Sequence, residues 1–257
     1  LTLNPFSGNQ LYIEIDDLHL DERVSIMKNE DFKKKLLSEN GSSSNGLVKS
    51  IIRNIDNIYV LDKIPDYEPH KETSLGSKAK KLNREINDYI YDILLEEDGN
   101  SLLYYPIGNY LDYSLEASLE MISSDHTLLG LGDGGAHCAT ICDASFTTHM
   151  LTFWGRDRTR GKKLDLPWII KSYTRDNALA IGLKDRGLIK EGMKADINII
   201  DFDNLTLYSP EIRYDLPAEG KRLVQRVDGY KYTIVSGKVT YVDGVSTGEL
   251  PGRLIRS

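Results

Sequence analysis

The sequence is poor in cysteine, and that scarcity limits the kind of protein it encodes. Its 257 residues include only two cysteines, Cys138 and Cys142, too few for the disulfide framework of a small secreted protein. We therefore expect a reducing, cytoplasmic environment. No signal peptide is visible, and the chain begins at Leu1 rather than at a methionine. One expectation is therefore that an upstream segment was removed or left out.

Long apolar runs and an excess of basic residues are also missing. No run approaches the roughly 20 residues of a membrane helix. The formal net charge is −7, and the basic residues are scattered, so we expect neither a nucleic-acid partner nor an anionic membrane surface. What is present, 40% hydrophobic and 28% charged residues, is typical of a folded globular protein with a substantial core.

A glycine-rich stretch at residues 127–138 is the feature around which we interpret the chain. The apolar run at 128–131 is bounded by glycines, which is typical of a buried parallel strand. Asp133 then lies at the carboxyl end of that strand, where barrels and open α/β folds place their catalytic residues. Gly134 and Gly135 allow a sharp turn near a ligand. An ordinary Asp-Gly-Gly turn is the alternative.

The rest of the chain predicts alternating strands and helices. We expect strands at 58–61, 102–107 and 128–131, and helices at 21–40, 83–97, 114–122 and 166–181. Such alternation is typical of βαβ units in a parallel sheet. After Gly187 the pattern changes to β structure. A strand is expected at 196–201, and a hairpin is expected at 232–242 with Ser236-Gly237 as its turn.

Several stretches resemble one known group of hydrolases. They are Pro106-Ile107-Gly108-Asn109-Tyr110, Gly130-Leu131-Gly132-Asp133-Gly134-Gly135-Ala136-His137, Asp185-Arg186-Gly187-Leu188, Gly192-Met193-Lys194-Ala195-Asp196 and Leu250-Pro251-Gly252-Arg253-Leu254. Along most of its length the chain resembles the N-acyl-D-amino-acid deacylase (D-aminoacylase-like) branch of the amidohydrolase superfamily. The stretch at 192–196 is fairly specific, as the return strand into the small β-sandwich of amidohydrolases.

The resemblance implies a fold and a reaction. It implies carboxyl-terminal βα units of a (β/α) TIM-type barrel at 1–187, followed by part of a β-sandwich at 188–257. It implies zinc-dependent hydrolysis of the amide in an N-acyl-D-amino acid, with Asp133 sharing the metal and passing a proton from water to the leaving amine. A metal lowers the pKa of bound water toward neutrality, and a carboxylate within hydrogen-bond reach can move the proton.

The sequence departs from this family in its metal ligands. The His-x-His pair that opens the family's barrel is missing, and the five histidines are dispersed at positions 19, 70, 126, 137 and 149. We count three βα units, whereas a complete barrel has eight and needs about 250 residues. The chain thus resembles the last third to half of such an enzyme. We expect the metal ligands to lie upstream, and this chain alone to bind no zinc and to be inactive.

Three residues are candidates for binding the substrate. His137 is expected on the loop that also carries Asp133, Asn109 follows the second predicted strand, and Arg156 has the guanidinium geometry that suits a carboxylate. Packing, or a solvated position, is the alternative for each.

Other reactive side chains have simpler interpretations. Cys138 and Cys142 are expected to be buried cysteines, because a structural zinc site needs a second ligand pair nearby. Arg158 and Arg160 are expected to be solvated in the loop that also holds Arg156. His149 and Trp154 are expected to pack in the interior.

Three functions remain open. The first is the deacylase, which requires residues 128–131 to form an interior parallel strand and Asp133 to lie at a cavity. The second is a non-catalytic subunit or remnant that docks a separate amino-terminal half or a second copy, because a partial barrel exposes open sheet edges. The third is another amidohydrolase activity, such as hydrolysis of a cyclic amide.

Overall fold

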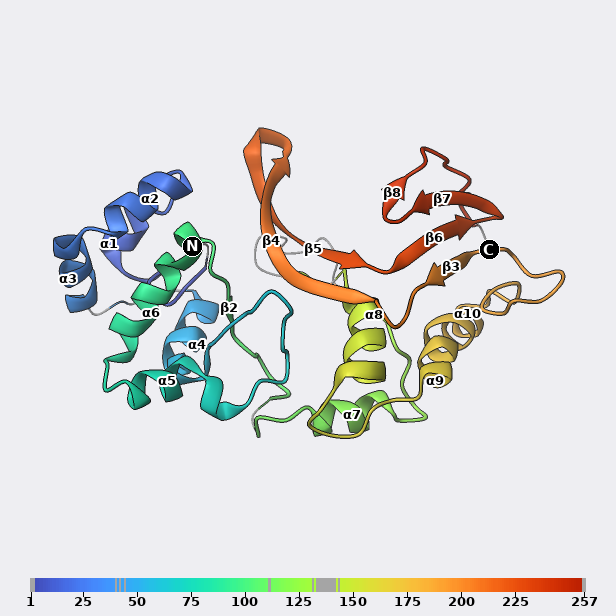
Figure 1. Ribbon diagram of the computed structural model, residues 1–257, viewed down its shortest axis with the longest axis horizontal. Coiled ribbons are helices and arrows are strands. Elements are labelled where there is room, and N and C mark those ends of the chain that lie inside the picture. Colours follow the sequence, from blue (N-terminus) through green and yellow to red (C-terminus); the bar gives the residue numbers. More distant parts are fainter. Residues whose placement is uncertain are drawn as a thin grey trace. The chain divides into compact units, whose positions relative to one another are not determined.

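The computed structural model describes residues 3–39, 41, 43, 45–110, 112–130, 132, 142 and 144–255. The contacts divide the chain into two compact units, Leu1–Leu115 and Glu116–Ser257 (Figure 1). Helices and strands are mixed in both, which confirms a fold containing both α and β structure. The predicted domain boundary between residues 187 and 188 falls inside the second unit and remains a prediction. In the parts of the chain that are described, no helix is both long and apolar enough to cross a membrane.

The first unit is mainly helical. Its elements are α1 (Gln10–Ile13), α2 (Leu20–Met27), α3 (Glu30–Ser38), α4 (Gly46–Arg53), β1 (Tyr59–Val60), α5 (Leu75–Lys81), α6 (Ile86–Leu95) and β2 (Leu103–Tyr104). The single helix predicted at 21–40 is in fact two helices. The side chain of Asn29 accepts hydrogen bonds from the backbone amides of Asp31 and Phe32, so it caps a new helix where we expected the first to continue.

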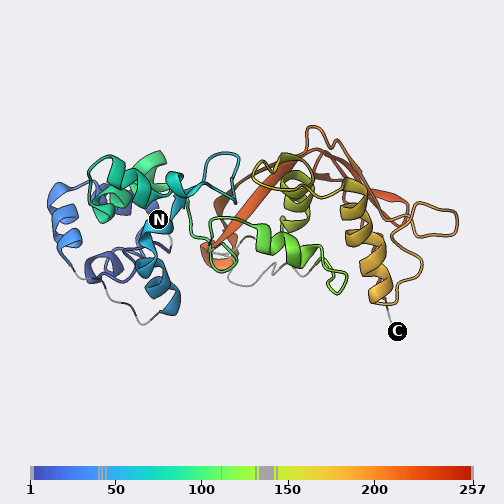
Figure 2. The same cartoon turned by 90° about the horizontal axis from the view of Figure 1, so that it is seen from below.

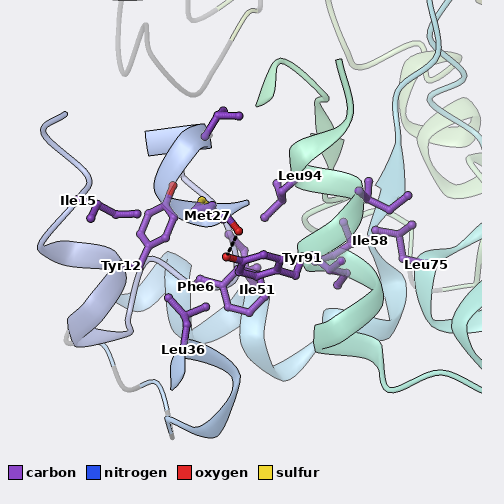
Figure 3. Close-up of a cluster of buried hydrophobic side chains, with 13 residues drawn as sticks. Phe6, Tyr12, Ile15, Met27, Leu36, Ile51, Ile58, Leu75, Tyr91 and Leu94 are labelled. Carbon is purple, nitrogen blue, oxygen red and sulfur yellow. Dashed lines mark hydrogen bonds between the residues drawn. The ribbon is translucent and has the colours of Figure 1, made fainter. Parts of the chain in front are cut away.

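The core of the first unit lies between these helices (Figure 3). Tyr91 of α6 is completely buried, and its hydroxyl donates to the carbonyl of Met27 at the end of α2 over 2.7 Å. Phe6 packs edge-to-face on the same ring, with centroids 5.7 Å apart. At the surface, Lys33 of α3 lies 2.8 and 2.6 Å from two carboxylates of α6, Asp88 and Asp92. Apolar burial and an ion-pair network therefore both attach α6 to the preceding helices.

The two strands of the first unit correct a prediction. β1 and β2 lie within the ranges expected for strands, but they pair antiparallel, with Tyr59 opposite Tyr104 and Val60 opposite Leu103. We predicted parallel pairing from the alternation of strands and helices. Apolar runs report burial, whereas strand direction depends on the path of the connection. That path includes two helices and a long loop, a length that permits either direction.

The second unit begins with helices. They are α7 (Glu116–Ile122), α8 (Phe146–His149) continued by the wider π-type turns of η4 (Met150–Asp157), and α9 (Leu166–Lys171) continued through η5 (Ser172–Asp176) into α10 (Asn177–Ala180). The last three follow one another as the helix predicted at 166–181 (Figure 2). Asp165 caps its start by accepting from the amide of Trp168, Pro167 occupies its first turn, and Gly182 with φ +81° ends it.

Antiparallel strands make up the remainder. They are β3 (Ile197–Ile200), β4 (Thr206–Leu216), β5 (Gly220–Asp228), β6 (Tyr230–Val235), β7 (Lys238–Val242) and β8 (Val245–Ser246). The sheet order is β3-β6-β7-β8, and β4 pairs with β5 in a long separate hairpin. The turn at Ser236 and Gly237 has φ of 52° and 78°, which confirms the predicted hairpin turn. Neither a sandwich nor a barrel fragment follows from these described strands, and both stay predictions.

Candidate functional site

A half-open cleft in the second unit adjoins the glycine-rich stretch. Its volume is about 330 Å³. The residues that line it are Met121, Ile122, Thr127, Leu128, Leu129, Gly130, Phe146, His149, Met150 and Tyr173. They come from the end of α7, the segment that follows it, the start of the α8–η4 helix, and η5. Four separate pieces of chain thus converge on one cavity.

Hydrogen bonds from side chains to the backbone hold the segment at 127–130 in the wall of the cleft. The hydroxyl of Thr127 lies 2.9 Å from the carbonyl oxygen of Met121 and 3.0 Å from that of Ser124, which folds the chain back against the end of α7. Farther along, the side-chain amide of Asn177 donates to the carbonyl of Leu129. The segment is therefore fixed by side chains rather than by a sheet.

This arrangement corrects the strand predicted at 128–131. Residues 128–130 belong to no strand, and only Leu129 among them is buried. The side-chain amide of Asn177 donates a hydrogen bond to the Leu129 carbonyl, which in a sheet would accept one from the backbone of a neighbouring strand. The requirement for an interior strand is therefore not met by the described part of this run.

The polar groups that line the cleft are neutral at pH 7. Burial lowers the pKa of His149 from 6.5 to about 4, and its ring stacks on Phe153 with centroids 4.9 Å apart. Burial also raises the pKa of Tyr173 to about 12. None of the ten lining residues is Asp, Glu, Lys or Arg. The part of the cleft wall formed by described residues is therefore uncharged and largely apolar, with hydrogen-bonding groups from Thr127, His149 and Tyr173.

The predicted catalytic residue lies just outside what the structure describes. Asp133, together with His137 and Cys138, falls outside the described residues. Their predicted roles, including that of Asp133 as a metal ligand, stay predictions. Cys142 is half-buried.

Asn109 belongs to the first unit. It is exposed on a turn after Gly108, whose φ is +74°. Its neighbour Tyr110 is buried and donates its hydroxyl to the carbonyl of Pro69. The turn that carries Asn109 is thus attached to the loop after β1. A substrate-binding role for Asn109 stays a prediction.

Arg156 lies on η4, not in the loop where we expected it. Its guanidinium donates to the carbonyl of Phe202, to that of Asp203 at 3.2 Å and to that of Leu205 at 2.7 Å. Asp157 pairs with the same group at 2.7 Å, and this hydrogen-bonded carboxylate raises the pKa of Arg156. The side chain therefore joins the helix to the turn before β4. Its substrate-binding role remains a prediction.

Arg158 was expected to be solvated, and the structure shows the opposite. It is almost completely buried, with its guanidinium carbon 4.7 Å from the ring centroid of Trp154. It donates to a carboxylate oxygen of Glu116 at 2.8 Å and to the carbonyl of Lys162 at 2.9 Å. The four-residue spacing from Trp154, across the end of η4, was the only sequence signal for this contact. Trp154 itself is buried, which confirms its predicted packing role, whereas His149 reaches the cleft.

The described residues do not form the zinc site that the resemblance implies. Nowhere among them do three His, Cys, Asp or Glu side chains come together closely enough to hold a metal ion. We therefore derive no catalytic step through a metal, and the zinc requirement stays a prediction.

Comparison with known proteins gives the family. The model of the amidohydrolase family matches residues 100–241, which is more than half of the chain. This range contains the cleft, the glycine-rich stretch and strands from β2 to most of β7. Searches of curated proteins and of solved structures found no match. The chain belongs to the amidohydrolase family and carries a hydrolase domain of that superfamily.

Proposed function

We propose that this chain contributes the glycine-rich catalytic loop of a deacylase that hydrolyses the amide bond of N-acyl-D-amino acids. The observation that carries the proposal is the position of Gly130. This residue lines the cleft, and Asp133 follows it by three residues within the range that matches the family. Three peptide units span at most about 11 Å, and the proposal requires the Asp133 carboxylate to reach the cleft over that length of chain. A carboxylate on a loop can serve a cleft as well as one on a strand.

In this proposal Asp133 moves the proton. Water attacks the amide carbonyl carbon, the carboxylate of Asp133 accepts a proton from that water, and the same proton goes to the leaving nitrogen as the carbon–nitrogen bond breaks. The products are a carboxylic acid and a free amine. His137, Asn109 and Arg156 are the proposed contacts for the substrate carboxylate or carbonyl. The guanidinium of Arg156 already donates hydrogen bonds to three backbone carbonyls and to Asp157, which leaves few of its N–H groups for a substrate.

The substitution Asp133→Asn tests the proposed proton transfer. In the full protein as it is produced by its source, we expect it to lower kcat for N-acyl-D-amino acids by at least about 100-fold, the lower end of a general acid–base contribution. Metal content should be unchanged. Asp125→Asn makes the same chemical change at an exposed turn and should retain the activity. Hydrolysis that persists in Asp133→Asn would remove Asp133 from the mechanism.

Zinc and a partner are part of the same proposal. Zinc would be held by ligands outside the described residues, from an amino-terminal half or from a second copy of the chain, in a reducing cytoplasm. Elemental analysis of this purified chain should find no stoichiometric zinc, whereas the native protein should contain it. Turnover of a cyclic amide without turnover of N-acyl-D-amino acids would favour the other amidohydrolase activity. A metal-free native protein that assembles but hydrolyses neither would favour the docking role.

A further inference from the structure

We propose that the cleft between α7, residues 127–130, the α8–η4 helix and Tyr173 binds the uncharged acyl arm of the amide substrate. This inference rests on the proposed function for the identity of the ligand, but the binding site itself is argued from the cleft alone. Two properties of the cleft define the class of ligand: the character of its lining and its volume.

The lining formed by described residues disfavours charged ligands. Six of the ten lining residues have large apolar side chains: Met121, Ile122, Leu128, Leu129, Phe146 and Met150. The others carry no formal charge at pH 7, since His149 and Tyr173 both titrate far from neutrality. An ion moved against these ten described residues loses its hydration and gains no partner of opposite charge from them. An acyl chain pays no such penalty and buries its own apolar surface.

The volume limits the size of the ligand. An engineered apolar cavity of about 150 Å³ holds the six carbons of benzene, so a cleft of about 330 Å³ has room for a chain of at least six carbons. It is near the lower end of ordinary small-molecule sites, which begin at about 300 Å³. The hydroxyl of Tyr173, which lines the cleft, can hydrogen-bond one polar atom of such a chain. The ligand class is therefore a short apolar chain with one neutral polar group.

Straight-chain alcohols test the binding site without catalysis. Isothermal titration of the purified chain at pH 7 should show 1-hexanol binding about fifteenfold more tightly than 1-butanol, because each buried methylene contributes about a fourfold gain. Hexanoate and hexylammonium should bind at least tenfold more weakly than 1-hexanol. Absence of 1-hexanol binding would overturn the assignment of the cleft. Binding of hexanoate and hexylammonium that is as tight as that of 1-hexanol would also overturn it.

A matched pair of variants locates the alcohol. Leu128→Asp places a charge in the wall of the cleft at a side chain that is 60% exposed, so the fold should tolerate it. It should weaken binding of 1-hexanol at least tenfold. Leu82→Asp makes the same change at the end of α5, where the leucine is 58% exposed, and should leave binding unchanged. Equal effects of the two variants would place the alcohol elsewhere and overturn the proposal.

Hydrolysis by the full protein separates this inference from the proposed function. We expect the KM for N-hexanoyl-D-alanine to be at least tenfold below that for N-acetyl-D-alanine, and Leu128→Asp to remove most of this difference. Hydrolysis of both substrates with equal KM would overturn the acyl-arm assignment and leave the deacylase intact. Binding of 1-hexanol as predicted, with hydrolysis of neither substrate, would overturn the proposed function and leave only the apolar site.

Discussion

At the scale of single residues, Gly187 explains why one motif of the resemblance contains glycine. Its φ is +78°, and a Cβ atom built on it would lie 2.5 Å from the Cα of Arg175. The backbone at Asp185-Arg186-Gly187 therefore passes directly against η5, with no room for a side chain. The guanidinium of Arg175 donates to the carbonyl of Arg186 at 2.9 Å, which holds the two segments together. The motif is thus a packing feature of the helix that ends at α10.

This close approach predicts that alanine destabilises the protein more at Gly187 than at Gly182. Gly182 also has a positive φ, +81°, but a Cβ there would meet nothing within 4 Å. Gly182→Ala should lower the free energy of unfolding by about 1–2 kcal/mol, the cost of the left-handed conformation. Gly187→Ala should lower it by about 2–4 kcal/mol because overpacking is added. Urea unfolding measures both, and equal losses would contradict the steric explanation.

His149 predicts a pH dependence of stability. Its pKa is 6.5 in an unfolded chain and about 4 in the folded protein, because burial disfavours the imidazolium. The unfolded chain therefore binds a proton that the folded protein does not, and stability falls as the pH drops from about 6.5 toward 4. This contribution is fully present above pH 6.5, and its loss amounts to at most about 3 kcal/mol. Urea unfolding between pH 4.5 and 8 measures it.

A pair of glutamine variants isolates the histidine from the carboxylates that titrate in the same range. His149→Gln should give a flatter profile of unfolding free energy against pH than the parent protein. His126→Gln removes an exposed histidine and should keep the parent profile. Parallel profiles for the parent and His149→Gln would show that this imidazole does not control the acid sensitivity.

At the scale of elements, the sequence predicted the turns and helix ends that are determined by nearby residue types. Ser236-Gly237 is a hairpin turn because glycine adopts a positive φ without strain, and the structure confirms it. The helix at 166–181 was predicted because Pro167 and Gly182 mark its ends, and the structure adds the Asp165 cap. By contrast, the hairpin of β4 and β5 turns through Ala218 and Glu219 at φ of 57° and 58°. Neither residue is a turn former, but Pro217 and Gly220 on either side of them are, and we predicted no hairpin from that pair.

Other elements depended on contacts that a sequence pattern does not contain. The run at 128–130 was apolar enough for a strand, but the Asn177 amide takes the Leu129 carbonyl and the run forms a cavity wall instead. The cleft was missed for a related reason. His149 was interpreted as a packing residue, and its neighbours in the cleft come from segments spread over about fifty residues. Asp133, the central prediction, lies outside the described residues and was predicted from sequence alone.

At the scale of the whole molecule, the two units predict two unfolding transitions. Each has its own set of contacts, and separate cores often unfold separately. The chain has two tryptophans, Trp154 and Trp168, and both belong to the second unit. Tryptophan fluorescence therefore follows the second unit alone, whereas far-ultraviolet circular dichroism follows the helices of both.

Two core substitutions test this independence. Leu36→Ala removes a fully buried side chain from the first unit, and Ile169→Ala removes one from the second; each should cost about 2–5 kcal/mol. Leu36→Ala should shift part of the dichroism transition and leave the fluorescence transition in place, whereas Ile169→Ala should shift the fluorescence. If Leu36→Ala shifts both probes together, the chain unfolds as a single cooperative unit.

The hairpin of β4 and β5 has one more consequence. Each of its strands pairs only with the other among the described strands. Backbone amides that point toward the partner strand are therefore hydrogen-bonded, whereas the amides between them point away from it. We therefore expect the hydrogen–deuterium exchange rates of the backbone amides in this hairpin to alternate between slow and fast from one residue to the next. The alternation should break between Leu207 and Pro210 and again between Arg213 and Leu216, where the register shifts.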